Sequence, residues 1–358
     1  MVEYYESATA VTICGPRAFG VRGWQAVSRM IKKSCQLAEL EITNHPLEAN
    51  HAPVISRALH AFSCKLRVLC LQRTLLAGDP LLCLVIALKT NTSIRELRLG
   101  DNQLTASDAA QLALLLRYNT RLQLLDLSNN QIQDAGAGHI AEALADQATQ
   151  TPPSATNSPM SPHQCPLSGY ESRGLAFLVL WNNQLTRNCA HHLSKALTSK
   201  SLCVLNVGRN ALGGEALRAL GACGALVSLG LQAARLGPTA ARALADLVAA
   251  DHKLQRLDLR DNKLGEQGLQ AILQALSKNT SLTQIDLDEP TDTSNLSAED
   301  GEAVVVARLT REIRALCRKN EPTATSPERR VHRKISLTCH STCIPRVSEC
   351  CYCESQTN

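Results

Sequence analysis

Residues 122–132 read LQLLDLSNNQI, and they follow the pattern LxxLxLxxNxL, in which the last position accepts isoleucine. The pattern recurs with its first apolar residue at positions 37, 66, 94, 122, 175, 202, 226, 254 and 282. Most steps are close to 28 residues, the length of one strand plus one helix. The single step of 53 residues, from 122 to 175, indicates a repeat with an insertion. A degenerate unit at Val11 and Ile13 extends the array by one.

Each unit predicts a strand followed by a helix. The apolar residues of 122–132 should point inward, and stretches such as 135–144 and 265–276 carry apolar residues three and four apart, as an amphipathic helix does. Parallel strands joined by crossover helices must lie buried side by side, so stacked units share one core. The sequence therefore predicts an α/β fold, a leucine-rich-repeat horseshoe solenoid with parallel strands on the concave face and helices on the convex face.

An asparagine recurs at the turn after most of the predicted strands. Its amide both donates and accepts hydrogen bonds, so it can bond backbone groups of neighbouring coils. We expect a structural asparagine ladder, although Ala234 interrupts it and the early repeats are irregular there. The members of this ladder are Asn102, Asn130, Asn183, Asn210 and Asn262.

Changes in composition divide the chain into five parts. The insertion and the tail are polar, and the tail is basic and rich in cysteine, so we expect both to be disordered. Ser297 and Asp300 resemble a capping box at the start of a helix that should seal the solenoid. The predicted parts are 1–144, the first repeats, with an N-terminus that we expect to be truncated; 145–173, a Pro/Ser-rich insertion; 174–290, the second repeats; 291–320, a capping helix; and 321–358, the tail.

Neither a membrane span nor a secretory signal is visible. No run of about 18 apolar residues occurs, and the start MVEYYESATA lacks the basic and apolar regions of a signal peptide. Of the 15 cysteines, nine lie in repeats or flanking helix, where a buried thiol replaces Ala or Val. We therefore expect an intracellular protein, cytoplasmic or nuclear, with reduced cysteines and no membrane contact.

No sequence motif supports catalysis, a cofactor or a metal. A nucleophile elbow, a phosphate-binding loop and a dinucleotide fingerprint are all missing. The tail cysteines include no second pair at a fixed distance, which a four-ligand zinc site would need. We expect a non-enzymatic protein without cofactor or metal.

The concave face is the predicted partner site. Taking the third, fifth and seventh positions of each unit as outward facing places an apolar patch at mid-array with acidic residues near both ends. Trp181 is the expected anchor because an exposed Trp on a rigid sheet is a common hot spot. The alternative is that Trp181 folds against the neighbouring coil or is covered by the insertion. The patch comprises Leu124, Phe177, Val179, Trp181 and Val204.

Several segments resemble a family of leucine-rich-repeat regulatory subunits of protein phosphatase 1. They are MVEYYESAT (1–9), RGWQAV (22–27), IRELRLGDNQL (94–104), LVLWNNQLT (178–186) and LQRLDLRDNKL (254–264), and the resemblance runs from about residue 1 to 320. It implies a subunit with ribonuclease-inhibitor-like repeats that binds the phosphatase catalytic subunit and inhibits it.

The family resemblance also implies a short docking motif of a basic residue, Val or Ile, any residue, then Phe or Trp. In this chain the nearest match is Lys334, Ile335, Ser336 and Leu337, where Leu replaces the aromatic residue. One alternative is a repeat scaffold that does not bind the phosphatase. A less favoured one is a nucleic-acid binder that uses the basic run 329–334, which lacks interleaved aromatic residues for base stacking.

Overall fold

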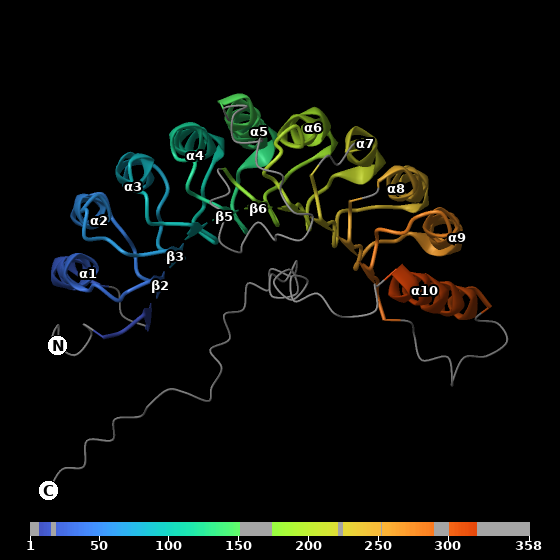
Figure 1. Ribbon diagram of the computed structural model, residues 1–358, viewed down its shortest axis with the longest axis horizontal. Helices are drawn as coiled ribbons and strands as arrows, with labels where there is room; N and C mark the ends of the chain where they lie inside the picture. The colour runs from blue at the N-terminus through green and yellow to red at the C-terminus, as the bar shows by residue number, and fades with distance from the viewer. Residues whose placement is uncertain are drawn as a thin grey trace, which may run out of the picture.

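The computed structural model describes residues 7–15, 19–150, 174–220, 225–251, 253–289 and 301–320. Strand and helix alternate along these residues, and the coils stack into an arc with the strands on its inner side and the helices on its outer side (Figure 1). The predicted horseshoe solenoid is confirmed.

Ten parallel strands form one sheet in chain order, each paired with the next. The register is regular: Ala10 pairs with Glu39, and Glu39 pairs with Val68. The degenerate unit at Val11 and Ile13 is therefore a true repeat. The strands are β1 (Ala10–Cys14), β2 (Glu39–Thr43), β3 (Val68–Gln72), β4 (Glu96–Arg98), β5 (Leu124–Asp126), β6 (Phe177–Val179), β7 (Val204–Asn206), β8 (Ser228–Gly230), β9 (Arg256–Asp258) and β10 (Gln284–Asp286).

The helices line the convex side, and each packs on its neighbours in sequence. In each coil the strand and the helix face the same interior. Because the coils stack on one another, their inward leucines form a single core. The helices are α1 (Val21–Lys33), α2 (Ala52–Leu59), α3 (Asp79–Lys89), α4 (Ala106–Tyr118), α5 (Gln133–Gln150), the 3₁₀ helix η3 (Arg187–Cys189), α6 (Ala190–Ala196), α7 (Gly213–Ala219), α8 (Pro238–Ala250), α9 (Gly265–Leu276) and α10 (Gly301–Asn320).

The C-terminal end of the core is covered by α10, which packs on α9 and β10. Leu309, Ile313 and Cys317 of α10 are buried in the core. The Arg314 guanidinium donates to the Leu287 carbonyl at 2.9 Å, which ties the helix to the end of the last strand. The capping-box residues Ser297 and Asp300 lie outside the described residues.

One boundary differs from the sequence-based prediction. Helix α5 continues to Gln150, whereas the sequence predicted an insertion from residue 145. The reason is local: Gln147 is buried and its amide donates to the carbonyls of Leu116 and Asn119, which anchors the extra turns on α4. Residues 151–173 and the tail 321–358 lie outside the described residues.

Candidate functional site

The centre of the concave face carries one row of large apolar side chains. Leu124 pairs with Phe177, and Phe177 pairs with Val204, so the three lie abreast on β5, β6 and β7. With Ala176 they form a hydrophobic cluster separate from the main core, and their exposed fractions are only 4–8%. The expectation of an exposed apolar patch is therefore wrong for these three side chains. Neighbouring strands lie about 4.8 Å apart, so side chains at the same register cover each other's flanks.

Trp181 is also buried, with 7% of its surface exposed. Its ring lies against Gly208, which holds the equivalent place in the next coil; a Cβ added to Gly208 would lie 2.4 Å from Cζ3 of Trp181. The prediction of an exposed Trp anchor is wrong, and the alternative that Trp181 folds against the neighbouring coil is what the structure shows. The repeat pattern does not reveal which residue Trp181 packs against, because the indole occupies the space that a side chain at position 208 would need.

Val179 is the remaining member of the predicted patch, and it is partly exposed. Its register partner on β5 is Asp126, whose pKa is raised by burial even though the Ser128 amide donates to the carboxylate at 2.9 Å. On the other side of β5, the register partner of Asp126 is Arg98 of β4, whose side chain is exposed. We call the buried row together with Val179, Asp126 and Arg98 the central strip of the concave face. Its accessible part combines an apolar side chain with charged neighbours.

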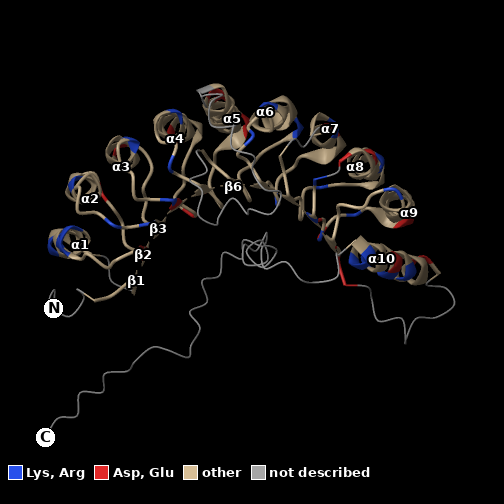
Figure 2. Ribbon diagram, viewed as in Figure 1, with Lys and Arg blue, Asp and Glu red and all other residues tan. Residues whose placement is uncertain are grey.

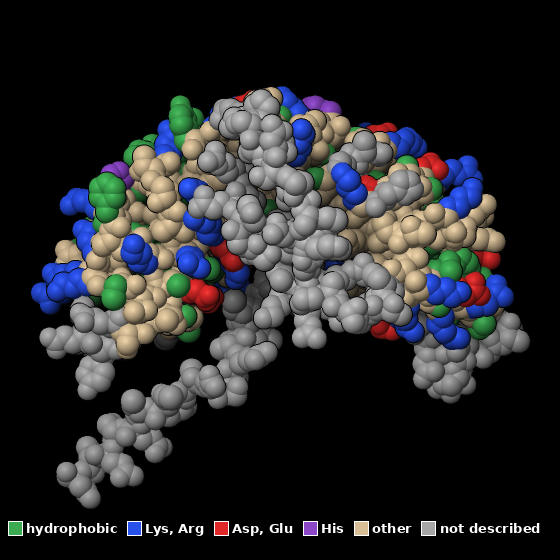
Figure 3. All heavy atoms as spheres, in the orientation of Figure 1, with side chains coloured by type: hydrophobic (Ala, Val, Ile, Leu, Met, Phe, Trp, Pro, Cys, Tyr) green, Lys and Arg blue, Asp and Glu red, His purple; other side chains and the backbone are tan. Residues whose placement is uncertain are grey.

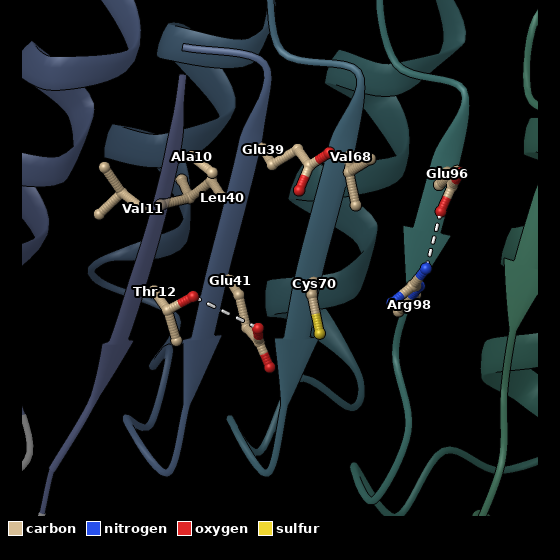
Figure 4. A pocket seen from close by; sticks show the side chains of 10 residues that line it. All are labelled: Ala10, Val11, Thr12, Glu39, Leu40, Glu41, Val68, Cys70, Glu96 and Arg98. Carbon is tan, nitrogen blue, oxygen red and sulfur yellow. Dashed lines mark hydrogen bonds and ion pairs between the residues drawn. The ribbon is translucent and has the colours of Figure 1, made fainter. Parts of the chain in front are cut away.

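A shallow hollow of about 190 Å³ lies at the N-terminal end of the concave face, over β1 to β4. Figure 4 shows its lining side chains projecting from adjacent strands, with carboxylates on β2 and β4. Glu96 pairs with Arg98 at 2.9 Å, and the Thr12 hydroxyl donates to Glu41 at 3.5 Å. The hollow is polar and predominantly acidic, and it is lined by Ala10, Val11, Thr12, Glu39, Leu40, Glu41, Val68, Cys70, Glu96 and Arg98.

The C-terminal end of the concave face is a network of ion pairs. Arg256 contacts Asp286 at 2.9 Å, and Arg260 contacts Asp258, a fully buried carboxylate, at 2.6 Å. The hydrogen bond with Asp258 is the main reason why the pKa of Arg260 is raised. Arginine and aspartate side chains at this end of the concave face therefore largely pair with one another.

The asparagines singled out from sequence bond adjacent coils to each other. The Asn130 side-chain oxygen accepts from the amides of Asn102 and Leu104 at 2.9 and 3.0 Å, and its amide donates to the Leu99 and Leu127 carbonyls. Asn102, Asn183, Asn210 and Asn262 form the same kind of contacts. In the irregular second repeat His45 takes this position, where it is buried and stacked on Phe19 at 3.9 Å between ring centroids.

A second ladder, which sequence analysis missed, runs along the ends of the helices. The Asn119 amide donates to the Leu88 carbonyl of the previous coil at 2.7 Å, while its oxygen accepts from its own Leu122 amide at 3.1 Å. Asn91 and Asn279 make equivalent bonds. The signal was present, since each asparagine precedes the first apolar residue of its unit by three positions.

The described residues contain neither a cluster of metal-ligating side chains nor a membrane-spanning helix. Within the ranges that the structure describes, no three His, Cys, Asp or Glu side chains gather as metal ligands would. No helix in those same ranges is both long and apolar enough to cross a bilayer. The predicted docking residues Lys334, Ile335, Ser336 and Leu337 lie outside the described residues, as do the tail cysteines.

The repeat pattern also matches a known sequence family. The model of that family, described as Leucine Rich repeat, matches residues 90–113, 118–141 and 250–273, which fall on three of the coils described above. The fold is a leucine-rich-repeat solenoid. Ribonuclease inhibitor from Sus scrofa is 26% identical to the chain over 269 residues, which are 71% of this chain and 58% of that protein.

Stronger sequence similarity connects this leucine-rich-repeat solenoid with phosphatase regulators. Protein phosphatase 1 regulatory subunit 37 from Bos taurus is 38% identical over 187 residues, which cover 52% of this chain and 23% of the bovine protein. A homologue of that subunit from Caenorhabditis briggsae is 33% identical over 210 residues, 58% of this chain and 20% of the nematode protein. The chain thus spans about a quarter or less of the length of these curated relatives.

Proposed function

We propose that this chain is a non-catalytic scaffold that regulates protein phosphatase 1 by binding its catalytic subunit. The observation that carries the proposal is the similarity at 38% identity to a protein named as a regulatory subunit of that phosphatase. A rigid sheet of ten parallel strands with a large concave surface suits a protein that binds another protein. Inhibition is the expected form of regulation, as the family resemblance implies.

The proposed partner surface is the central strip of the concave face. The buried row of Leu124, Phe177 and Val204 would shape its floor, while Val179 and the charged Arg98 and Asp126 would contact the partner. Trp181 would support the strip from within, because its ring fills the space above Gly208. Charged neighbours around an apolar centre give specificity and orientation in protein interfaces.

Direct binding of the chain 1–358 to the purified phosphatase 1 catalytic subunit, measured by calorimetry, tests the proposal. We expect a saturable 1:1 complex. The double variant Ile335→Ala with Leu337→Ala removes the apolar residues of the degenerate docking motif, and Ile344→Ala with Val347→Ala is its matched control in the tail. Loss of binding only in the first variant would place docking in the tail.

A second pair of variants locates the contact on the repeats. Val179→Glu should weaken binding at least tenfold if the concave strip contacts the phosphatase, whereas Val304→Glu on the exposed side of α10 should not. If no variant and no wild-type protein binds, the phosphatase proposal is wrong, and a repeat scaffold without phosphatase binding is favoured. Salt-sensitive retention of RNA or DNA, lost on deleting 321–358, would instead favour the nucleic-acid alternative.

A further inference from the structure

Large apolar side chains project into solvent from the convex side of the first coils. Ile86 on α3 and Tyr118 on α4 are 59% and 65% exposed, and Phe62, just after α2, is completely exposed. Leu82 lies one turn from Ile86, and Leu114 one turn from Tyr118, so the side chains form two adjacent pairs on neighbouring helices. We call Phe62, Leu82, Ile86, Leu114 and Tyr118 the convex patch.

The later coils, those of α5 to α9, provide an internal control for this patch. Ile86 and Leu114 each stand eight residues before the first apolar residue of the next unit's pattern. The residues at that same place in α6 to α9 are polar, and so is the residue of α5 that follows Leu114 by 28 positions. The repeat fold therefore does not require an apolar side chain there, and the apolar residues of α3 and α4 need another explanation. The polar residues are Glu142, Ser194, Arg218, Asp246 and Gln274.

The surface around the convex patch is strongly basic. Helices α1 to α4 contain seven Lys or Arg residues and two acidic residues, of which Asp108 is buried and bonded to Thr105. Figure 3 shows basic and hydrophobic side chains together along this arm, whereas acidic side chains are more frequent on the other arm. Figure 2 shows the same bias on the helices themselves.

Among the described cations of α1 to α4, Arg117 forms ion pairs, with Asp146 at 2.8 Å and Glu142 at 4.0 Å. Arg57 and the α1 cations Arg29, Lys32 and Lys33 form no ion pair within the part of the chain that the structure describes. Lys89 lies 4.4 Å from the centre of the Tyr118 ring, so charge and apolar surface meet directly. The arm thus presents apolar residues with a basic border, and most charges of this border lack an acidic partner in the described part of the chain.

We propose that the convex patch binds an acidic amphipathic helix of a partner protein. The parallel helices α3 and α4 offer two ridges, between which the apolar side of a third helix can pack. Its acidic residues would then face Arg57, Lys65 and Lys89. The basic border disfavours both the chain's own basic tail and a second copy of this arm, because like charges would meet. This inference goes beyond the proposed regulation of the phosphatase and does not rest on it.

A designed peptide tests the proposal on the full chain 1–358. The probe is a fluorescein-labelled helical peptide of about 20 residues, with Leu at i, i+3, i+4 and i+7 spacing and Glu on the polar side. The matched probe has the same Leu positions with Lys in place of Glu. Fluorescence anisotropy should show saturable binding of the acidic probe, with affinity that falls as salt increases, and at least tenfold weaker binding of the basic probe.

Two variants locate the contact. Ile86→Ser with Leu114→Glu introduces the side chains found at this place in α6 and α5, so the fold should tolerate them, and binding of the acidic probe should fall at least tenfold. Val304→Glu, an exposed apolar position on α10, is the control and should leave binding unchanged. Arg57→Glu with Lys65→Glu should weaken binding and reduce its salt dependence.

Three outcomes would overturn the proposal. They are equal affinity for the acidic and basic probes, unchanged binding after Ile86→Ser with Leu114→Glu, and no binding of the acidic probe. Vesicles of phosphatidylserine that bind the chain in place of the probe would reassign the patch to a membrane surface. Self-association lost in the same variant would reassign it to a contact between copies.

Discussion

The concave centre and the convex patch contain similar apolar residues, which are buried in the concave centre and exposed in the convex patch. Phe177 on β6 is 4% exposed, although it faces away from the main core, whereas Ile86 on α3 is 59% exposed. Phe177 lies abreast of Leu124 and Val204 at a strand spacing of about 4.8 Å, so apolar side chains of both neighbouring coils cover its flanks. Packed helices lie 8–10 Å apart, which leaves the flanks of an outward side chain such as Ile86 more open to solvent.

Exposure of an apolar residue in this solenoid therefore depends on which face it occupies and on the residue next to it in the following coil. Trp181 shows the second condition most clearly, because its burial requires Gly208. An exposed apolar group is better evidence of a partner site on the convex side than on the sheet.

The largest expected effect comes from replacing Trp181. Trp181→Ala should lower the free energy of unfolding by about 3 kcal/mol, because it removes a buried indole and leaves a cavity above Gly208. Urea denaturation followed by circular dichroism measures it. Val179→Ala is the matched control in the same coil, with an expected loss below about 1 kcal/mol. A loss for Trp181→Ala no greater than that of the control would mean that the indole is a surface group.

Gly208→Ala examines the same contact from the other side. The added methyl would meet the Trp181 ring and also the Gln232 carbonyl oxygen, 2.8 Å away, so unfolding should become easier by about 2 kcal/mol. The cost should be smaller in a Trp181→Ala background, where only the carbonyl contact remains. Gly237→Ala, which meets nothing within 4 Å, is the control. Strictly additive losses in the double variant would show that Trp181 and Gly208 do not touch.

Acid should destabilise the N-terminal coils through His45. Burial lowers the pKa of His45, and neither ring nitrogen has a hydrogen-bond partner among the described residues. Because the unfolded chain binds this proton more readily, stability should fall as pH decreases below about 6.5, by at most about 1.4 kcal/mol per pH unit. His45→Asn, which introduces the residue used at this place in other coils, should reduce the dependence between pH 7.5 and 5.5. An unchanged pH profile in this variant would show that His45 does not cause it.

The repeat architecture was predictable because its signals are local and periodic. Spacing of the leucines defined the strands and their parallel order, and the asparagine that recurs at position nine of five units identified residues that bond neighbouring coils. Helix α5 ran past its predicted end because Gln147 bonds carbonyls of α4, a contact between coils that no pattern within one coil reveals.

The concave patch was only partly predictable. Alternation along the strands correctly assigned the side chains of Leu124, Phe177 and Val204 to the side of the sheet opposite the main core. How much of each side chain remains exposed depends on its neighbours across strands, and the glycine beside Trp181 is decisive. The convex patch could have been found from sequence by aligning helices between repeats, since Leu114 aligns with Glu142.

The smallest expected effect comes from replacing Leu114, an exposed residue of the convex patch. Leu114→Glu should change the free energy of unfolding by no more than about 0.5 kcal/mol, because the side chain already lies partly in water and the helix accepts Glu142 at the same place in the next coil. Leu115→Glu, one residue away and 1% exposed, is the contrasting variant and should prevent stable folding of the coil. Thermal denaturation of both variants measures the difference. A large loss for Leu114→Glu would show that this leucine stabilises the solenoid itself, and the convex patch would then need no partner to explain it.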